Sequence, residues 1–144
     1  MQKLPALIAT LASLLMVAPG CRQPVQDGGT AWTIVAESDM TPEQTVQRDK
    51  ALAARNEMFA SLKSRLIEVV GSEGPDAAIS VCSTEALQIA EQVSEEHGLK
   101  IGRTSFRLRN PDNATPTWAK QLVADRVAEP TYLTQEGKFA ALLP

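Results

Sequence analysis

The chain is organised around two neighbouring segments, Ala77-Ala-Ile-Ser-Val-Cys-Ser-Thr-Glu-Ala86 and Ile101-Gly-Arg-Thr-Ser-Phe-Arg-Leu-Arg-Asn-Pro-Asp-Asn113. The first contains Cys82, whose thiol can ligate a metal or take part in redox chemistry. The second contains Arg103, Arg107 and Arg109, which crowd one short segment of an otherwise acidic chain. Guanidinium groups suit carboxylates, so the three arginines indicate either an anion site or a solvated charged face. These four residues form the candidate site.

Length and charge narrow the classes of protein that fit. A chain of 144 residues is long enough for one domain with a hydrophobic core. Its formal net charge of -3 is not the basic balance expected of a nucleic-acid-binding domain. We therefore expect a single globular domain with no nucleic-acid partner.

The first 21 residues have the pattern of a targeting segment. Lys3 precedes an apolar run over residues 4–17, and small residues lead directly to Cys21. The arrangement resembles the lipobox of bacterial lipoproteins, in which the cysteine is acylated, and an ordinary secretory signal is the alternative. Either pattern predicts export, and the first predicts a periplasmic protein anchored to a bacterial membrane through Cys21.

Residues 22–40 are predicted to form a flexible tether between the membrane and the domain. They contain Pro24, two adjacent glycines and few periodic apolar residues, a composition that buries little surface. Trp32, Ile34 and Val35 could form a short strand at its end, which the pattern leaves open. The domain itself is assigned to residues 41–144.

A first long helix is predicted from Thr41 to Gly71. Thr41 can cap it, Pro42 suits the first helical position, and Gln44 stands in capping-box register. Apolar residues then recur at helical steps, and we expect them to face the core. They are Leu52, Phe59, Leu62, Leu66 and Val69 or Val70.

A second helix is predicted from residue 73 to a cap at Gly98. Its apolar stripe comprises Ile79, Cys82, Ala86, Ile89 or Ala90, and Val93. Cys82 is therefore expected on the core-facing side. It is either a buried small hydrophobic residue or a thiolate that faces a cofactor slot. His97, the single histidine, has no second ligand at metal-site spacing and is predicted to lie at the surface.

The C-terminal third predicts a strand, a helix and a hairpin. Residues 100–109 alternate, with Phe106 on one side and the three arginines on the other, which is typical of a strand. Residues 110–113 form a turn pattern, and Thr115-Pro116 is expected to cap a third helix that carries Trp118, Leu122, Val123 and Val127. Residues 132–134 and 139–143 then predict a β-hairpin.

The predicted fold class is α+β, with two long N-terminal helices packed on a small antiparallel sheet and a third helix. Its most distinctive motifs are Ala78-Ile79-x-Val81-Cys82, Ile89-Ala90, and the string from Gly102 to Asn113, followed by Trp118. In these motifs the chain resembles the periplasmic c-type haem domain family with a PAS-like sensor fold, long catalogued as a domain of unknown function. The resemblance covers residues 41–144.

The resemblance implies haem as the cofactor, held between helices and a small antiparallel sheet. It implies Cys82 as an axial iron ligand and Arg103, Arg107 and Arg109 as neighbours of the haem propionates. The family attaches haem through a Cys-x-x-Cys-His motif after a strand like residues 139–143, and this sequence contains no such motif. It also has Leu87 and Ala119 where the resemblance leads us to expect Pro and Glu. A C-terminally incomplete domain, loosely bound haem and loss of haem all explain these departures.

Three functions follow as hypotheses. The first is an exported, membrane-tethered haem domain for redox or gas sensing or electron transfer, with a redox partner protein or a second copy as possible partners. The second is a structural or ligand-binding lipoprotein in which Cys82 is a core residue. The third is a thiol redox protein that uses Cys82 as its nucleophile, although no second cysteine or histidine stands at a useful spacing. The first hypothesis describes a binding protein rather than an enzyme.

Overall fold

The computed structural model describes residues 31–144. The predicted targeting segment, Cys21 and the first part of the predicted tether lie outside the described residues. The elements are β1 (Thr33–Val35), a 3-10 turn η1 (Glu37–Asp39), α1 (Pro42–Glu73), α2 (Ala78–Ser80), a π-helical turn η2 (Val81–Glu85), α3 (Ala86–His97), the 3-10 turns η3 (Pro111–Asn113) and η4 (Thr117–Ala119), α4 (Lys120–Ala124), β2 (Thr131–Gln135) and β3 (Lys138–Leu142).

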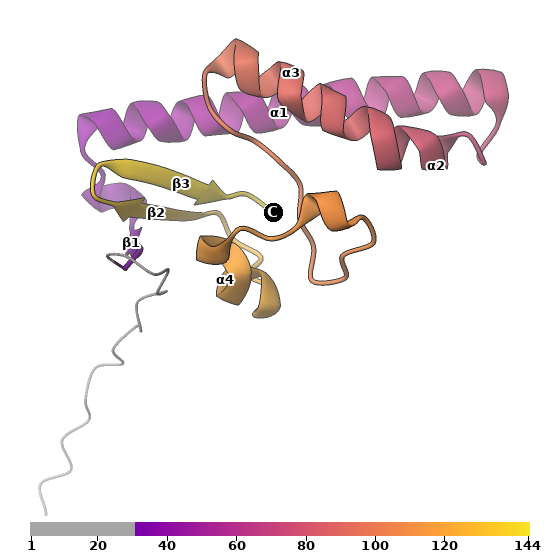
Figure 1. The fold of residues 1–144 in the computed structure, drawn as a ribbon. Helices are drawn as coiled ribbons and strands as arrows, with labels where there is room; N and C mark the ends of the chain where they lie inside the picture. The colour runs from indigo at the N-terminus through magenta and orange to yellow at the C-terminus, as the bar shows by residue number, and fades with distance from the viewer. Residues whose placement is uncertain (1–30) are drawn as a thin grey trace, which may run out of the picture.

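The fold is α+β, as the sequence predicts at this level. The long helix α1 crosses the whole domain, α3 packs along it, and the hairpin β2–β3 lies beneath its N-terminal half (Figure 1). One core cluster lies between the helices and contains Ala54, Met58, Ala90 and Val93. A second cluster joins the sheet to α4 and contains Trp32, Leu122 and Leu133.

The start of α1 is confirmed, its predicted end is wrong, and its predicted core face is confirmed only in part. Thr41 and Gln44 form both hydrogen bonds of the capping box, 2.9 and 3.2 Å long. The helix continues through Gly71 and ends before Gly74, whose φ of 90° favours glycine. Of the predicted face, Val69 is buried and Leu62 packs on the helical core cluster, whereas Phe59 is 65% exposed. The other buried residues of α1 are Ala54 and Met58. Alanine on both facing helices, at positions 54 and 90, lets α1 and α3 approach closely, so this face packs inward.

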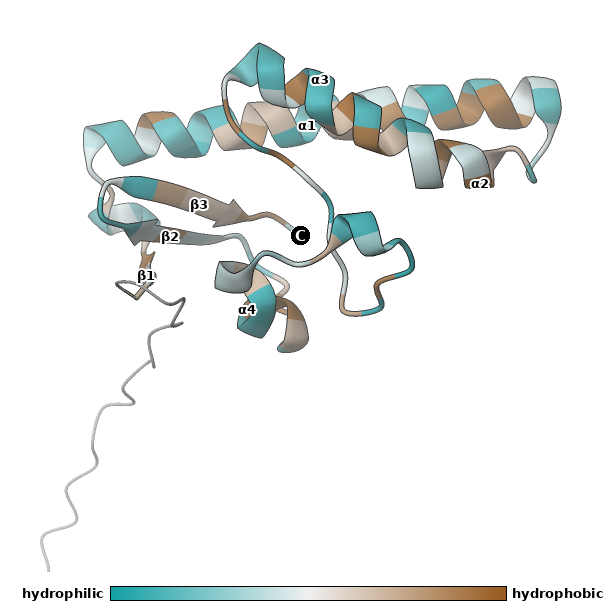
Figure 2. Cartoon of the chain, viewed as in Figure 1, coloured by the Kyte–Doolittle hydropathy of each residue, from teal (hydrophilic) through white to brown (hydrophobic). Residues whose placement is uncertain are grey.

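The hydropathy of α1, α3 and the hairpin agrees with the way these elements pack. Figure 2 shows α1 and α3 alternating between teal and brown around their axes, while most of the hairpin is apolar or neutral. Several large apolar side chains of α1 remain in solvent. They are Val46, Phe59, Ile67 and Val70.

The second predicted helix is interrupted by the π-helical turn η2, and this changes which side chains face the core. Cys82 is exposed, and its neighbour Val81 is buried at 1% exposure. A π-helical turn holds one more residue than an α-helical turn, so the apolar stripe shifts its register there. Cys82 is therefore not a core residue, and the prediction that it shares the core face is wrong. The cap at Gly98 is confirmed, with φ of 58°.

The predicted hairpin is confirmed, and a third strand joins it. The turn residues Glu136 and Gly137 have φ of 46° and 78°, which suits the two-residue turns of hairpins. Strand β1 pairs antiparallel with β2, placing Ile34 opposite Leu133. Residues 31–40, which the sequence assigned to the tether, thus join the domain, because Trp32 is buried and β1 extends the sheet.

Residues 100–109 do not form the predicted strand. The segment joins neither outer edge of the sheet, whose strand order is β1-β2-β3, and runs as an irregular loop. Ile101 fixes the start of this loop, because it packs on the helical core cluster and its amide donates to Ser94 Oγ at 3.1 Å.

The predicted third helix is confirmed, but it is short. Thr115 does not cap it, because the Thr115 hydroxyl bonds the Thr104 hydroxyl instead.

Candidate functional site

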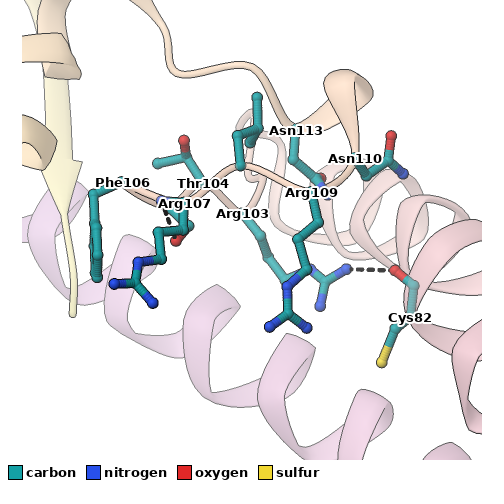
Figure 3. Close-up of a pocket in the computed structure, with 10 residues that line it drawn as sticks. Cys82, Arg103, Thr104, Phe106, Arg107, Arg109, Asn110 and Asn113 are labelled. Carbon is teal, nitrogen blue, oxygen red and sulfur yellow. Dashed lines mark hydrogen bonds between the residues drawn. The ribbon is translucent and has the colours of Figure 1, made fainter.

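The candidate site is built on the π-helical turn that carries Cys82. Within this turn the Ala86 amide donates to the Val81 carbonyl, five residues back. The carbonyl of Cys82 accepts a bond from Arg103 Nη2 at 3.0 Å, and that of Ser83 accepts one from Asn110 Nδ2 at 3.0 Å. The widened turn thus presents two carbonyls to side chains of the loop. These two bonds hold the loop against the helix, and Figure 3 shows the one from Arg103 to Cys82.

A hollow of about 470 Å³ lies where the loop meets the π-helical turn. Its walls are Cys82, the whole of residues 103–110 and Asn113. The structure therefore brings together Cys82, Arg103, Arg107 and Arg109, all four residues of the predicted site. It does so through the side-chain bonds of the loop, since the strand expected to align the arginines is absent.

The three arginines concentrate positive charge at this hollow. Figure 3 shows the guanidinium groups of Arg103, Arg107 and Arg109 extending to one side of the loop, the side on which the Cys82 thiol lies. Within residues 31–144 none of the three forms an ion pair with a carboxylate. Like charges at this spacing repel one another, and a bound anion would offset that repulsion. The hollow is therefore suited to an acidic ligand.

Apolar side chains line the same hollow. Phe106 is 52% exposed and Leu108 is 43% exposed, which leaves two large apolar groups in solvent next to the cations. The Arg107 guanidinium lies 5.7 Å from the centre of the Phe106 ring, within cation–π range. An anionic ligand with an apolar body would contact both kinds of group.

The π-helical turn is tied to α1 by a salt bridge that the sequence did not indicate. Arg65 Nε lies 2.6 Å from Glu85 Oε2, and Arg65 Nη1 lies 3.1 Å from Glu68 Oε2. The hydrogen bond from Arg65 lowers the pKa of the Glu85 carboxyl, and the two carboxylates raise the pKa of Arg65. The pair links α1 to the turn three residues after Cys82. No sequence signal marks it, because the pairing depends on how the two helices pack.

The remaining candidates lie elsewhere. His97 belongs to the far end of α3, where its Nε2 lies 2.7 Å from Glu57 Oε2, and it lines no wall of the hollow. No group of three metal-ligating side chains occurs in residues 31–144. Over the same range no helix is both long and apolar enough to cross a membrane.

Comparisons of the chain with protein-family models, with curated proteins and with solved structures gave no match. The function is therefore inferred from the hollow itself.

Proposed function

We propose that this domain binds haem at the hollow, with Cys82 as an axial iron ligand and the arginines as partners of the propionates. The observation that carries this proposal is that one exposed thiol and three arginines, which form no ion pair within residues 31–144, converge on a single hollow. Cys82 and Arg103 are joined directly through the Cys82 carbonyl. The proposed role is redox or gas sensing or electron transfer.

The residues present are compatible with haem. The volume of about 470 Å³ lies within the range of about 300–1,000 Å³ typical of small-molecule and cofactor sites. Phe106 and Leu108 provide apolar contact for a macrocycle, and arginine forks suit its carboxylates. Among the lining residues Cys82 alone offers a thiolate or imidazole donor. A bound haem would supply one-electron chemistry, and a thiolate axial ligand would tune its potential.

The wider proposal places the domain in the c-type haem family with a PAS-like fold. It further holds that the protein is exported, anchored to a bacterial membrane through Cys21, and acts with a redox partner protein or as a homodimer. Covalent attachment requires a Cys-x-x-Cys-His motif. Sequencing the source gene beyond codon 144 tests covalent attachment, because an in-frame Cys-x-x-Cys-His motif would define a covalent c-type haem protein.

Titration of the purified protein with ferric protoporphyrin IX tests haem binding directly. We expect a saturable Soret shift at one haem per chain, and a different Soret position in Cys82→Ser, because the axial sulfur is lost. The double variant Arg107→Gln/Arg109→Gln should bind about tenfold or more weakly, since each charge-assisted hydrogen bond is worth about 1.5–3 kcal/mol. Lys63→Gln, which removes an exposed charge from α1, should bind like the wild type.

A non-haem acidic ligand is the second candidate, and it is favoured by the three arginines, which pair with no carboxylate in the described part of the chain. In that case the arginine variants would weaken binding of carboxylate ligands, whereas Cys82→Ser would have no effect. A wild-type protein that produces no Soret shift would refute the haem proposal. The core-residue form of the lipoprotein hypothesis is wrong, because Cys82 is exposed.

A further inference from the structure

A second hollow, of about 350 Å³, lies beside the first. Its lining includes two cations, Lys120 and Arg126, with the Thr115 hydroxyl and the apolar side chain of Val123. Ser105 and Phe106 line both hollows. The two spaces are therefore neighbours that share the Phe106 ring as part of their walls.

One arginine from each hollow contacts this ring. The guanidinium carbon of Arg126 lies 4.3 Å from the ring centre of Phe106, and that of Arg107 lies 5.7 Å from it. The two carbons are therefore at most about 10 Å apart, which is close to the Debye length at physiological salt. Neither Lys120 nor Arg126 forms an ion pair with any carboxylate of residues 31–144. In both hollows, positive charge that no carboxylate of the described residues pairs with thus flanks an apolar ring.

The backbone at Arg126 adds an independent observation. Arg126 has φ of 53°, a left-handed conformation that favours glycine. It closes α4 in a Schellman motif, in which its amide donates to Val123 O at 3.1 Å and the Val127 amide donates to Leu122 O at 3.1 Å. A glycine at position 126 would adopt this left-handed conformation without strain. An arginine held here points to a use for the side chain, since strained positions gather at binding sites.

We propose that Lys120 and Arg126 form a second oxyanion subsite, which takes a carboxylate of the same ligand that occupies the first hollow. The ligand is then a di-acid with an apolar body that lies against Phe106, one acid group in each hollow. This inference rests on the proposed haem function and extends it, because it assigns the two propionates to separate cation sets. The same chemistry would accept free inorganic phosphate in the second hollow.

The test compares ferric protoporphyrin IX with its dimethyl ester, in which both acid groups are blocked. We expect Arg126→Gly to bind the free acid about tenfold more weakly than the wild type, with a melting temperature equal to or above that of the wild type. Arg126→Asn, which also tolerates the left-handed conformation, and Lys120→Gln should weaken binding in the same direction. For the dimethyl ester the wild type and the variants should bind equally. Lys63→Gln is the matched control for charge.

Three results would overturn the subsite. The first is free-acid affinity within twofold of the wild type in both Arg126→Gly and Lys120→Gln. The second is an equal loss for acid and ester, which would mean that Arg126 only positions Phe106. If the wild type binds no haem, the haem function fails, and inorganic phosphate then tests the subsite alone. If phosphate raises the melting temperature of the wild type but not that of Arg126→Gly, the subsite is supported. The third overturning result is that phosphate changes the melting temperatures of the wild type and Arg126→Gly equally.

Discussion

Trp32→Ala measures how firmly residues 31–40 belong to the domain. Trp32 is 8% exposed, and its ring lies 6.1 Å from that of Trp118 at a tilt of 43°. It packs in one cluster with Leu122 and Leu133. Replacing a buried aromatic residue by alanine costs about 3–5 kcal/mol. Because Trp32 lies at the first strand, where the chain can partly relax, we take the lower end, about 3 kcal/mol.

This free energy corresponds to a clear thermal shift. A domain of this size loses about 4–5 °C of melting temperature per kcal/mol, so Trp32→Ala should melt about 12–15 °C below the wild type. Phe59→Ala is the matched control, because it also truncates an aromatic residue but at a site that is 65% exposed. It should change the free energy of unfolding by no more than about 0.5 kcal/mol. Denaturation followed by circular dichroism measures both variants.

Either of two results would refute the reasoning. A Trp32→Ala variant that unfolds like the wild type would mean that residues 31–40 are a tether after all. A loss of several kcal/mol in Phe59→Ala would mean that Phe59 packs in the core, as the spacing of apolar residues predicts.

Three further predictions concern the thiol, the glycines and the carboxylates. The exposed Cys82 thiol should react with iodoacetamide in the native protein, as peptide mapping would show, and protection until unfolding would contradict its exposure. Gly71→Ala, inside α1 with open space around it, should stabilise the domain by about 0.5–1 kcal/mol in chemical denaturation. Gly98→Ala, at φ of 58°, should instead destabilise it by about 1–2 kcal/mol. Equal changes in stability for the two glycine variants would contradict the placement of Gly71 inside α1 and of Gly98 at the end of α3. Because Arg65 lowers the pKa of Glu85, the pair stabilises the fold above the unfolded pKa of about 4.5 and loses this contribution as pH falls through the lower folded pKa. Melting temperatures of Glu85→Gln between pH 6 and 3 should therefore fall less than those of the wild type, and parallel curves would contradict the pairing.

Elements with strong local signals were predictable from the sequence. The capping box at Thr41 and Gln44, the cap at Gly98 and the Glu136-Gly137 turn all depend on residues within a few positions of one another. Local hydrogen bonds and left-handed glycines fix such features whatever the rest of the chain does.

Features that depend on distant partners were not predictable. Alternation in residues 100–109 predicted a strand, but the segment pairs with no strand of the sheet, and its Arg103 and Asn110 side chains bond to the π-helical turn instead. The sequence grouped Cys82 with the core stripe because a regular helical period was assumed, whereas η2 changes the register. The left-handed conformation of Arg126 could not be predicted from the sequence, since an arginine is not expected in that conformation.

The candidate residues themselves nevertheless met at one site. Cys82 and the three arginines line one hollow although the strand expected to align the arginines is absent. The reason is that Arg103 and Asn110 bond to carbonyls of the π-helical turn, which draws the loop against the helix. Residue type and proximity in the chain indicated the chemistry, and the packing of the turn determined the geometry.

X-ray absorption at the iron edge of the haem-loaded protein tests the central claim most directly. The account predicts one sulfur scatterer in the first coordination shell of the iron in the wild type, and its loss in Cys82→Ser. A first shell of nitrogen and oxygen alone, identical in both proteins, would contradict Cys82 as the axial ligand.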